Sequence, residues 1–164
     1  MTTGRIITSD ACVAEGAADL ATRCPEFARA LPLTGPLPLR LRKDGFDELL
    51  SAIVSQQIST AAAAAVWKKM KTARLTGPRK IAAASDDDLR AAGLSRQKVR
   101  YARELAAARI NYTSLRTAPT DEVIATLIAV PGIGRWTAEI YAMFSLGRAD
   151  VFAHGDLALQ EAAK

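Results

Sequence analysis

The sequence has few of the residues that usually hold metals. It contains only two cysteines, Cys12 and Cys24, and a single histidine, His154, among 164 residues. These three residues form no CxxC pair and no four-ligand cluster, which zinc centres and iron–sulfur clusters need. We therefore expect two reduced thiols, no zinc site, no iron–sulfur cluster and no required cofactor.

Long hydrophobic runs are also missing. The longest apolar stretches, residues 61–67 and 124–130, fall far short of the roughly 20 residues that a membrane-spanning helix needs. The first ten residues contain no apolar core followed by small residues, as a secretion signal would. We therefore expect a cytoplasmic protein without membrane contact.

Acidic residues are absent from one long internal stretch. None lies between Glu48 and Asp86, and the whole chain has a formal net charge of +5. Basic residues gather in this gap and again after it, at Lys68, Lys69, Lys71, Arg74, Arg79 and Lys80 and then at Arg96, Lys98, Arg100, Arg103 and Arg109. Such clusters of one sign favour a polyanionic partner such as nucleic acid.

Alternation of apolar and polar residues with a period of two is nearly absent. Apolar residues instead recur every three or four positions, which is typical of helices that bury one face. The pattern predicts an all-α protein, with helices over residues 19–30, 44–58, 60–70, 86–92, 95–110, 121–129, 136–146 and 157–164. Residues 31–39 contain three prolines and predict a loop, because proline lacks the amide donor and clashes with the preceding turn.

The aspartates that follow Ser85 are interpreted as a helix start rather than a metal site. The Ser85 hydroxyl can accept a hydrogen bond from a free amide of the first turn. The carboxylates of Asp86, Asp87 and Asp88 would lie at the positive end of the helix dipole. Gly93 is then expected to end this short helix.

The most informative local pattern is the tetrad Pro131-Gly132-Ile133-Gly134 between two predicted helices. Two glycines allow positive φ angles and leave no side chain to block another backbone. Amides of the glycines and of the next helical turn can then point at one phosphate oxygen, while Ile133 enters the core. An ordinary interhelical turn is the alternative interpretation of the tetrad alone.

Other segments join this tetrad in a wider pattern. They are GPL at 35–37, FDELLSAIVSQQIS at 46–59, GLSRQK at 93–98, LIAVPGIGRW at 127–136 and DVFAHGD at 150–156. Together they resemble the helix-hairpin-helix DNA glycosylase superfamily, and within it the alkyladenine (3-methyladenine) DNA glycosylases of type II. The resemblance covers residues 17–164.

The resemblance implies a two-lobed helical fold. Residues 1–43 would contribute to one lobe, residues 44–130 would form the central lobe, and residues 131–164 would supply the hairpin and the catalytic loop of a single interleaved unit. The family usually continues in further helices beyond its acidic residue, so the fold is expected to be short at its C-terminus.

The resemblance also implies an activity. The chain would be a monofunctional DNA glycosylase of base excision repair, a hydrolase that flips out alkylated purines such as 3-methyladenine, cuts the N-glycosidic bond and leaves an abasic site. Its partner would be double-stranded DNA containing alkylated bases, which would associate it with a bacterial nucleoid, and we expect a monomer. A non-catalytic helix-hairpin-helix DNA-binding module and a helical protein-interaction domain are the alternatives.

The family's functional positions can be carried over to this sequence. Asp156 would be the catalytic carboxylate, with a purely structural N-cap as its alternative and Asp150 as the other acidic candidate. Trp136 and Tyr141 would line the base pocket. Gln57, in preference to Gln56, would be the wedge that fills the space left by the extruded base.

The resemblance further assigns contacts to the DNA backbone. The phosphate-binding residues would be Gly132, Gly134, Arg135, Trp136 and Thr137. A structural monovalent cation, Na⁺ or K⁺, would be held by the backbone carbonyls of Ile128, Val130 and Ile133. Lys68, Lys69 and Lys98 are interpreted as solvated phosphate contacts.

Two positions depart from the family pattern. Bifunctional relatives carry a lysine nucleophile where this sequence has Trp136, so no lyase activity is expected. The alkylbase enzymes often have an aromatic residue four positions after the tryptophan, where this sequence has Ile140.

Overall fold

The fold is described from a computed structural model, in which residues 3–162 are placed. These residues form α-helices connected by turns and contain no β-strand, so the all-α prediction is confirmed. The helices are α1 (Asp10–Arg23), α2 (Pro25–Thr34), α3 (Phe46–Ser55), α4 (Thr60–Thr72), α5 (Pro78–Ala83), α6 (Asp86–Ala91), α7 (Arg96–Ala107), α8 (Tyr112–Leu115), α9 (Thr120–Ile128), α10 (Arg135–Phe144) and α11 (Leu157–Ala162).

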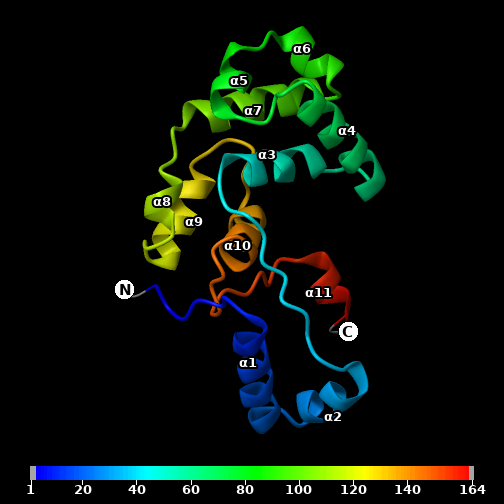
Figure 1. Cartoon of the computed structure of the whole chain (residues 1–164), viewed down its shortest axis with the longest axis vertical. Helices are drawn as coiled ribbons and strands as arrows, with labels where there is room; N and C mark the ends of the chain where they lie inside the picture. Colours follow the sequence, from blue (N-terminus) through cyan, green and yellow to red (C-terminus); the bar gives the residue numbers. More distant parts are fainter. Residues whose placement is uncertain (1–2, 163–164) are drawn as a thin grey trace.

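Helix α3 lies at the centre of the core. Its apolar face, predicted from the three- and four-residue spacing, is buried at Phe46, Leu49, Leu50, Ile53 and Val54. Figure 1 shows α4 to α7 on one side of this helix and α9 and α10 on the other. Since α3 packs against α4, α7 and α10, it joins the two groups of helices into one core.

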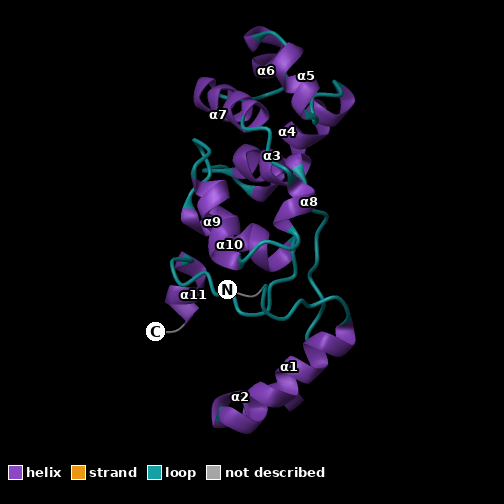
Figure 2. Cartoon of the chain, turned by 90° about the vertical axis from the view of Figure 1, so that its left-hand side faces the viewer, coloured by secondary structure: helices purple, strands orange, loops and turns teal. Residues whose placement is uncertain are grey.

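Helices α1 and α2 project away from the rest of the chain (Figures 1 and 2) and bury no residue. The helix predicted over 19–30 is wrong as a single element, because its residues are helical in α1 and α2 but the backbone is extended at Cys24 and Pro25 begins the second helix. The predicted loop over 31–39 is also wrong in its first part. Pro32 lies inside α2, which continues to Thr34 and ends at Gly35.

The predicted helix start at Ser85 is confirmed. The Ser85 hydroxyl accepts from the Asp88 amide, and the Asp88 carboxylate accepts from the Ser85 amide, so the two residues form a reciprocal capping box. Asp86 instead pairs with Arg103 of α7, at 2.6 Å between Oδ1 and the guanidinium. One residue of the second basic cluster is therefore already neutralised within the fold.

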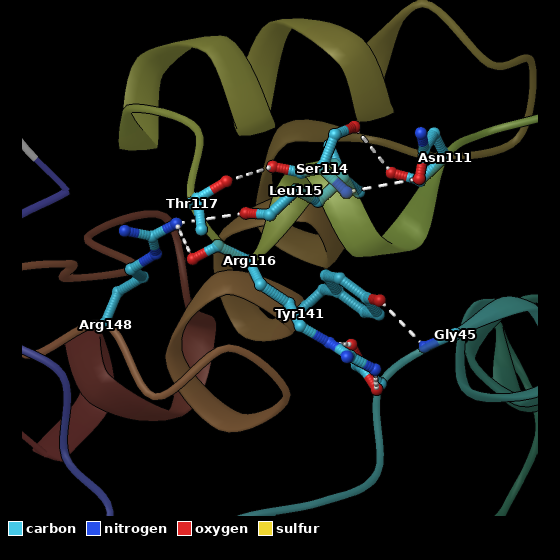
Figure 3. Close-up of polar contacts among 9 residues, drawn as sticks. Gly45, Asn111, Ser114, Leu115, Arg116, Thr117, Tyr141 and Arg148 are labelled. Atoms are coloured by element: carbon cyan, nitrogen blue, oxygen red, sulfur yellow. Dashed lines mark hydrogen bonds and ion pairs between the residues drawn. The ribbon is translucent and has the colours of Figure 1, made fainter.

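A buried arginine anchors the chain that follows α10. Arg148 is 3% exposed, and its guanidinium donates to the carbonyls of Thr3, Leu115, Arg116 and Ala118 at 2.7 to 3.1 Å. Figure 3 shows it reaching the carbonyl oxygens at the end of α8. Backbone bonds between residues 5–7 and 147–149 add to this attachment. The segment leading to residue 156 is thus tied to the body of the protein at its beginning.

Candidate functional site

The turn between α9 and α10, residues 131–134, will be called the hairpin. The Ile133 amide donates to the Val130 carbonyl at 3.0 Å, and the Ile133 side chain is only 4% exposed, as expected for a residue that fixes the turn in the core. Gly132 has a φ of +94°, and a Cβ at this position would lie 2.4 Å from Cγ of Tyr101. Both its conformation and its close contact therefore require glycine.

Gly134 differs from the prediction. Its φ is −83°, and a Cβ there would meet no atom within 4 Å, so the expected positive φ is wrong at this position. Gly134 instead caps α10, which keeps its amide outside the helical hydrogen-bond pattern. No described residue accepts a hydrogen bond from the amides of Gly132 and Gly134. These donors are free for an external anion.

Asp156 lies just before α11, and its two carboxylate oxygens have different partners. Oδ1 accepts from the amides of Ala158, at 2.8 Å, and Leu159, at 3.3 Å. Oδ2 accepts from the indole N–H of Trp136 at 2.8 Å. The Trp136 bond, followed by the backbone bonds, holds the pKa of Asp156 below its ordinary value, because each bond favours the ionised form.

A hollow of about 670 Å³ lies between α3 and α10, with Trp136 but not Asp156 among the residues that line it. Trp136 is 47% exposed and forms part of the wall of this hollow. Tyr141 also lines this hollow, although it is only 3% exposed. Its hydroxyl accepts a hydrogen bond from the Gly45 amide at 2.8 Å (Figure 3). Ile140 lies on the same wall. The Ser145 hydroxyl is buried there without a hydrogen-bond partner.

The turn after α3, residues 55–59, will be called the wedge turn. Gln57 is exposed and has a φ of +56°, which turns the backbone sharply at this residue. Gln56 is half-buried, and its Nε2 donates to the Gly132 carbonyl at 2.8 Å. The amide of Gln56 is thus occupied, whereas Gln57 is the glutamine that reaches solvent.

The other predicted phosphate contacts lie at the start of α10. Arg135 is exposed but donates through Nε to the buried carboxylate of Glu139 at 2.9 Å, so its charge is partly balanced. Thr137 is buried and lines the hollow, which leaves its side chain away from the surface. The indole N–H of Trp136 is already bonded to Asp156. For these last two residues, a phosphate contact would have to involve the backbone.

Lys98 is not the solvated lysine that the sequence suggested. Its Nζ donates to the Val54 carbonyl at 2.7 Å, at the end of α3, and burial lowers its pKa. Lys68 and Lys69 are exposed, as expected. The basic residues of α4 and α7 therefore differ in their availability to a polyanion.

The three carbonyls predicted to bind a cation accept few hydrogen bonds. Among the described residues, no amide donates to the carbonyls of Ile128 or Ile133, and the Val130 carbonyl accepts only from the Ile133 amide. Their oxygens thus retain lone pairs of the kind that hard monovalent cations prefer. Residues 3–162 contain no group of three or more His, Cys, Asp or Glu side chains that could hold a metal.

Two hydrogen bonds of the site were not predicted, the bond of Gln56 to the hairpin and the bond of Lys98 to α3. Each joins elements that are distant in sequence, so only the repeated polar positions after α3 gave any signal. The buried Ser145 hydroxyl without a hydrogen-bond partner was not predicted either.

No described helix is long and apolar enough to cross a membrane.

Residues 50–164 match the family model of the HhH-GPD superfamily base excision DNA repair protein. DNA-3-methyladenine glycosylase 1 of Schizosaccharomyces pombe is 31% identical over 128 residues, which cover 73% of this chain and 56% of that protein. DNA-3-methyladenine glycosylase 2 of Escherichia coli is 31% identical over 134 residues, covering 72% of this chain and 47% of the relative. The chain spans about half the length of these curated relatives.

Solved structures of 3-methyladenine DNA glycosylases are similar to this chain as well. The crystal structure of DNA-3-methyladenine glycosidase from Bacillus halodurans has a TM-score of 0.80 at 32% identity and covers all of this chain and 75% of its own. The Schizosaccharomyces pombe 3-methyladenine DNA glycosylase in complex with abasic DNA has a TM-score of 0.77 at 28% identity, covering 91% of this chain and 78% of its own. By its sequence and its fold, the chain belongs to the HhH-GPD superfamily of base excision DNA repair proteins.

Proposed function

We propose that this protein is a monofunctional DNA glycosylase that removes alkylated purines such as 3-methyladenine from double-stranded DNA and leaves an abasic site. The observation that carries this proposal is the hydrogen bond that Asp156 accepts from Trp136, a residue that lines the hollow between α3 and α10. It combines an exposed aromatic face with an oriented carboxylate. The similarity to 3-methyladenine glycosylases supports the substrate class.

Asp156 would act on the sugar. Breaking the N-glycosidic bond develops positive charge on the deoxyribose, and a fixed carboxylate beside it stabilises that charge. Three hydrogen bonds hold Asp156 in its ionised form, so the negative charge is present before the substrate arrives. The same carboxylate could orient the attacking water through either oxygen.

Trp136 would act on the base. Alkylation at a purine ring nitrogen makes the base of a nucleotide electron-poor and cationic, and such a ring stacks well on the face of an indole. Because the indole N–H is bonded to Asp156, the orientation of the ring is coupled to that of the carboxylate. Tyr141 and Ile140 would form the wall of the same base pocket.

The remaining elements would hold the DNA. The free amides of Gly132 and Gly134 would bind a backbone phosphate, helped by the dipole of α10. Arg135 would add charge through the part of its guanidinium that Glu139 leaves exposed. Gln57 would fill the space left in the base stack after extrusion.

The hairpin would also hold a monovalent cation through the carbonyls of Ile128, Val130 and Ile133. Two of these oxygens accept no hydrogen bond from a described residue, which supports the assignment. A bound Na⁺ or K⁺ would add positive charge close to the phosphate site.

The proposal is tested by release of free methylated base from an alkylated duplex. We expect Asp156→Asn to slow single-turnover release by on the order of 10² to 10³, because the amide supplies no negative charge. Duplex binding should persist, since the hairpin is unchanged. Asp150→Asn is the matched control, an acidic residue of the same segment that faces the N-terminal residue Gly4.

The release assay distinguishes a glycosylase from a non-catalytic DNA-binding module. Wild-type protein that binds duplex DNA in a salt-dependent manner but releases no base would be a DNA-binding module. Equal loss of release in both variants, or in neither, would remove Asp156 from the catalytic role.

A further inference from the structure

The wedge turn is held at its base by two neighbouring elements. Lys98 of α7 bonds to the Val54 carbonyl, and Gln56 bonds to the Gly132 carbonyl of the hairpin. Gln56, Lys98 and Gly132 line a polar hollow of about 360 Å³ between α3, α7 and the hairpin. The turn is therefore connected both to the core and to the predicted phosphate anchor.

The Gln56 contact is the more unusual of the two. It joins residues that are 76 positions apart, at 2.8 Å between Nε2 and the carbonyl oxygen, and Gln56 is half-buried. Gly132 lies outside α9 and α10, so its carbonyl belongs to a turn and not to a helical hydrogen-bond ladder. Its position is fixed independently, because Gly132 packs against the ring of Tyr101. The hydrogen bond of Gln56 thus fixes the distance between the wedge turn and the Gly132 carbonyl of the hairpin.

We infer that Gln56 is a positioning residue, which holds the wedge turn at a fixed distance from the hairpin so that Gln57 inserts beside the nucleotide whose phosphate the hairpin binds. This inference rests on the proposed function. Gln57 follows directly in the chain, and its left-handed backbone ties its direction to the peptide plane of Gln56. Without the Gln56 bond, the wedge turn would move relative to the hairpin. Phosphate binding would persist, but Gln57 would stabilise the extruded nucleotide less.

The effect of losing the Gln56 bond depends on the strength of the base pair that opens when the lesion is extruded. When the lesion is base-paired, its return into the base stack competes with extrusion. The extruded state then needs the wedge residue Gln57. A lesion opposite an abasic site has no pair to re-form, so extrusion depends less on the wedge. A positioning role therefore predicts a defect that the opposite strand can rescue, which general damage to the fold would not show.

The experiment compares Gln56→Met with wild type on 3-methyladenine-containing duplexes. Methionine keeps the length of the side chain and removes the amide donor. We expect single-turnover release to fall by on the order of fivefold, the loss typical of one neutral hydrogen bond, when the lesion is paired with thymine. With an abasic site opposite the lesion, release should remain within about twofold of wild type, and binding of undamaged duplex should not change.

Gln97→Met is the matched control, because Gln97 lines the same hollow but donates to the Tyr101 hydroxyl at 2.7 Å. It should release base at the wild-type rate from both duplexes. Equal slowing of Gln56→Met on both duplexes, or no slowing on either, would overturn the inference. If Gln56→Met fails to fold, as judged by its thermal transition, Gln56→Glu makes the same test with a side chain that the Gly132 carbonyl repels.

Failure of the proposed function can be recognised separately. Wild-type protein that releases no base contradicts the glycosylase proposal, and extrusion is then followed by the fluorescence of 2-aminopurine within a bound duplex. An increase in wild type that is lost in Gln56→Met would support the positioning role, and the same signal in both proteins would overturn it.

Discussion

Trp136 and Asp156 are joined by a hydrogen bond of 2.8 Å between the indole N–H and Oδ2 across 20 residues of sequence. The other oxygen, Oδ1, accepts from the amides of Ala158 and Leu159 in the first turn of α11. The carboxylate is therefore at once a helix cap and the partner of the aromatic ring. Because both sets of bonds favour the charged form, a structural cap and a catalytic carboxylate are compatible roles for one residue.

We predict that Trp136→Phe moves the acid limb of the pH profile of base release to higher pH. The folded-state pKa of Asp156 lies below its ordinary value of 3.8, with the Trp136 bond as the largest cause. Activity that needs the carboxylate is thus present above this pKa and is lost as the pH falls through it. Removing the indole N–H raises the pKa, so the loss begins at a higher pH.

The measurement is single-turnover release between pH 3 and pH 7, corrected for spontaneous depurination. Trp67→Phe is the control, because Trp67 is a half-buried indole that packs against the core away from Asp156. An unchanged acid limb in Trp136→Phe would contradict the assignment of Asp156 as the titrating group.

We predict opposite effects for substitutions of the two hairpin glycines. Gly132→Ala should destabilise the fold by about 2 kcal/mol or more, because its φ is positive and the new Cβ would clash with Tyr101. Gly134→Val should leave the thermal transition nearly unchanged, since the space around it is open. It should nevertheless weaken duplex binding about equally for all DNA sequences, because it blocks the approach of a phosphate.

Thermal unfolding and salt-dependent duplex binding test these two predictions. Strong DNA binding by Gly134→Val would show that the backbone of the hairpin does not contact phosphate. A stable Gly132→Ala would show that Tyr101 can move away.

The regular part of the fold was predictable because a helix with one buried face leaves a periodic pattern. The apolar positions of α3 and the cap at Ser85 are examples. The short helices α5 and α8 were missed, since four to six residues carry too little of the pattern. The break at Cys24 was missed because Pro25 can begin a helix as well as end one.

The residues of the site were predictable only where they belong to a sequence motif. The contact of Asp156 with Trp136 arises from folding of the loop over residues 145–156, and no local rule gives its partners. The positions of Gln56 and Lys98 likewise depend on the packing of α3 against α7 and the hairpin. The sequence predicts a solvated Lys98, because a lysine gives no local sign that its ammonium will cap a neighbouring helix.

We predict that Arg148→Met destabilises the protein by about 3 kcal/mol, because several buried or partly buried carbonyls lose their common donor together. Arg5→Met is the control. Arg5 pairs with Glu15 at the surface, where solvent screens an ion pair and leaves it little effect on stability. Urea unfolding of the two variants makes the comparison. Similar free energies of unfolding would show that Arg148 can be replaced by apolar contacts.

The last prediction concerns the abasic product. Trp136 stands where bifunctional relatives carry a lysine, so within residues 3–162 the side chain bonded to Asp156 is an indole and not an amine that could attack C1′ and form the Schiff base that precedes strand cleavage. Lys98 has a pKa lowered by burial, which raises its fraction of free amine, but its Nζ is bonded to the Val54 carbonyl. Borohydride should therefore trap no covalent complex with lesion-containing DNA. A trapped adduct would contradict the monofunctional assignment, and its loss in Lys98→Gln would identify Lys98 as the nucleophile.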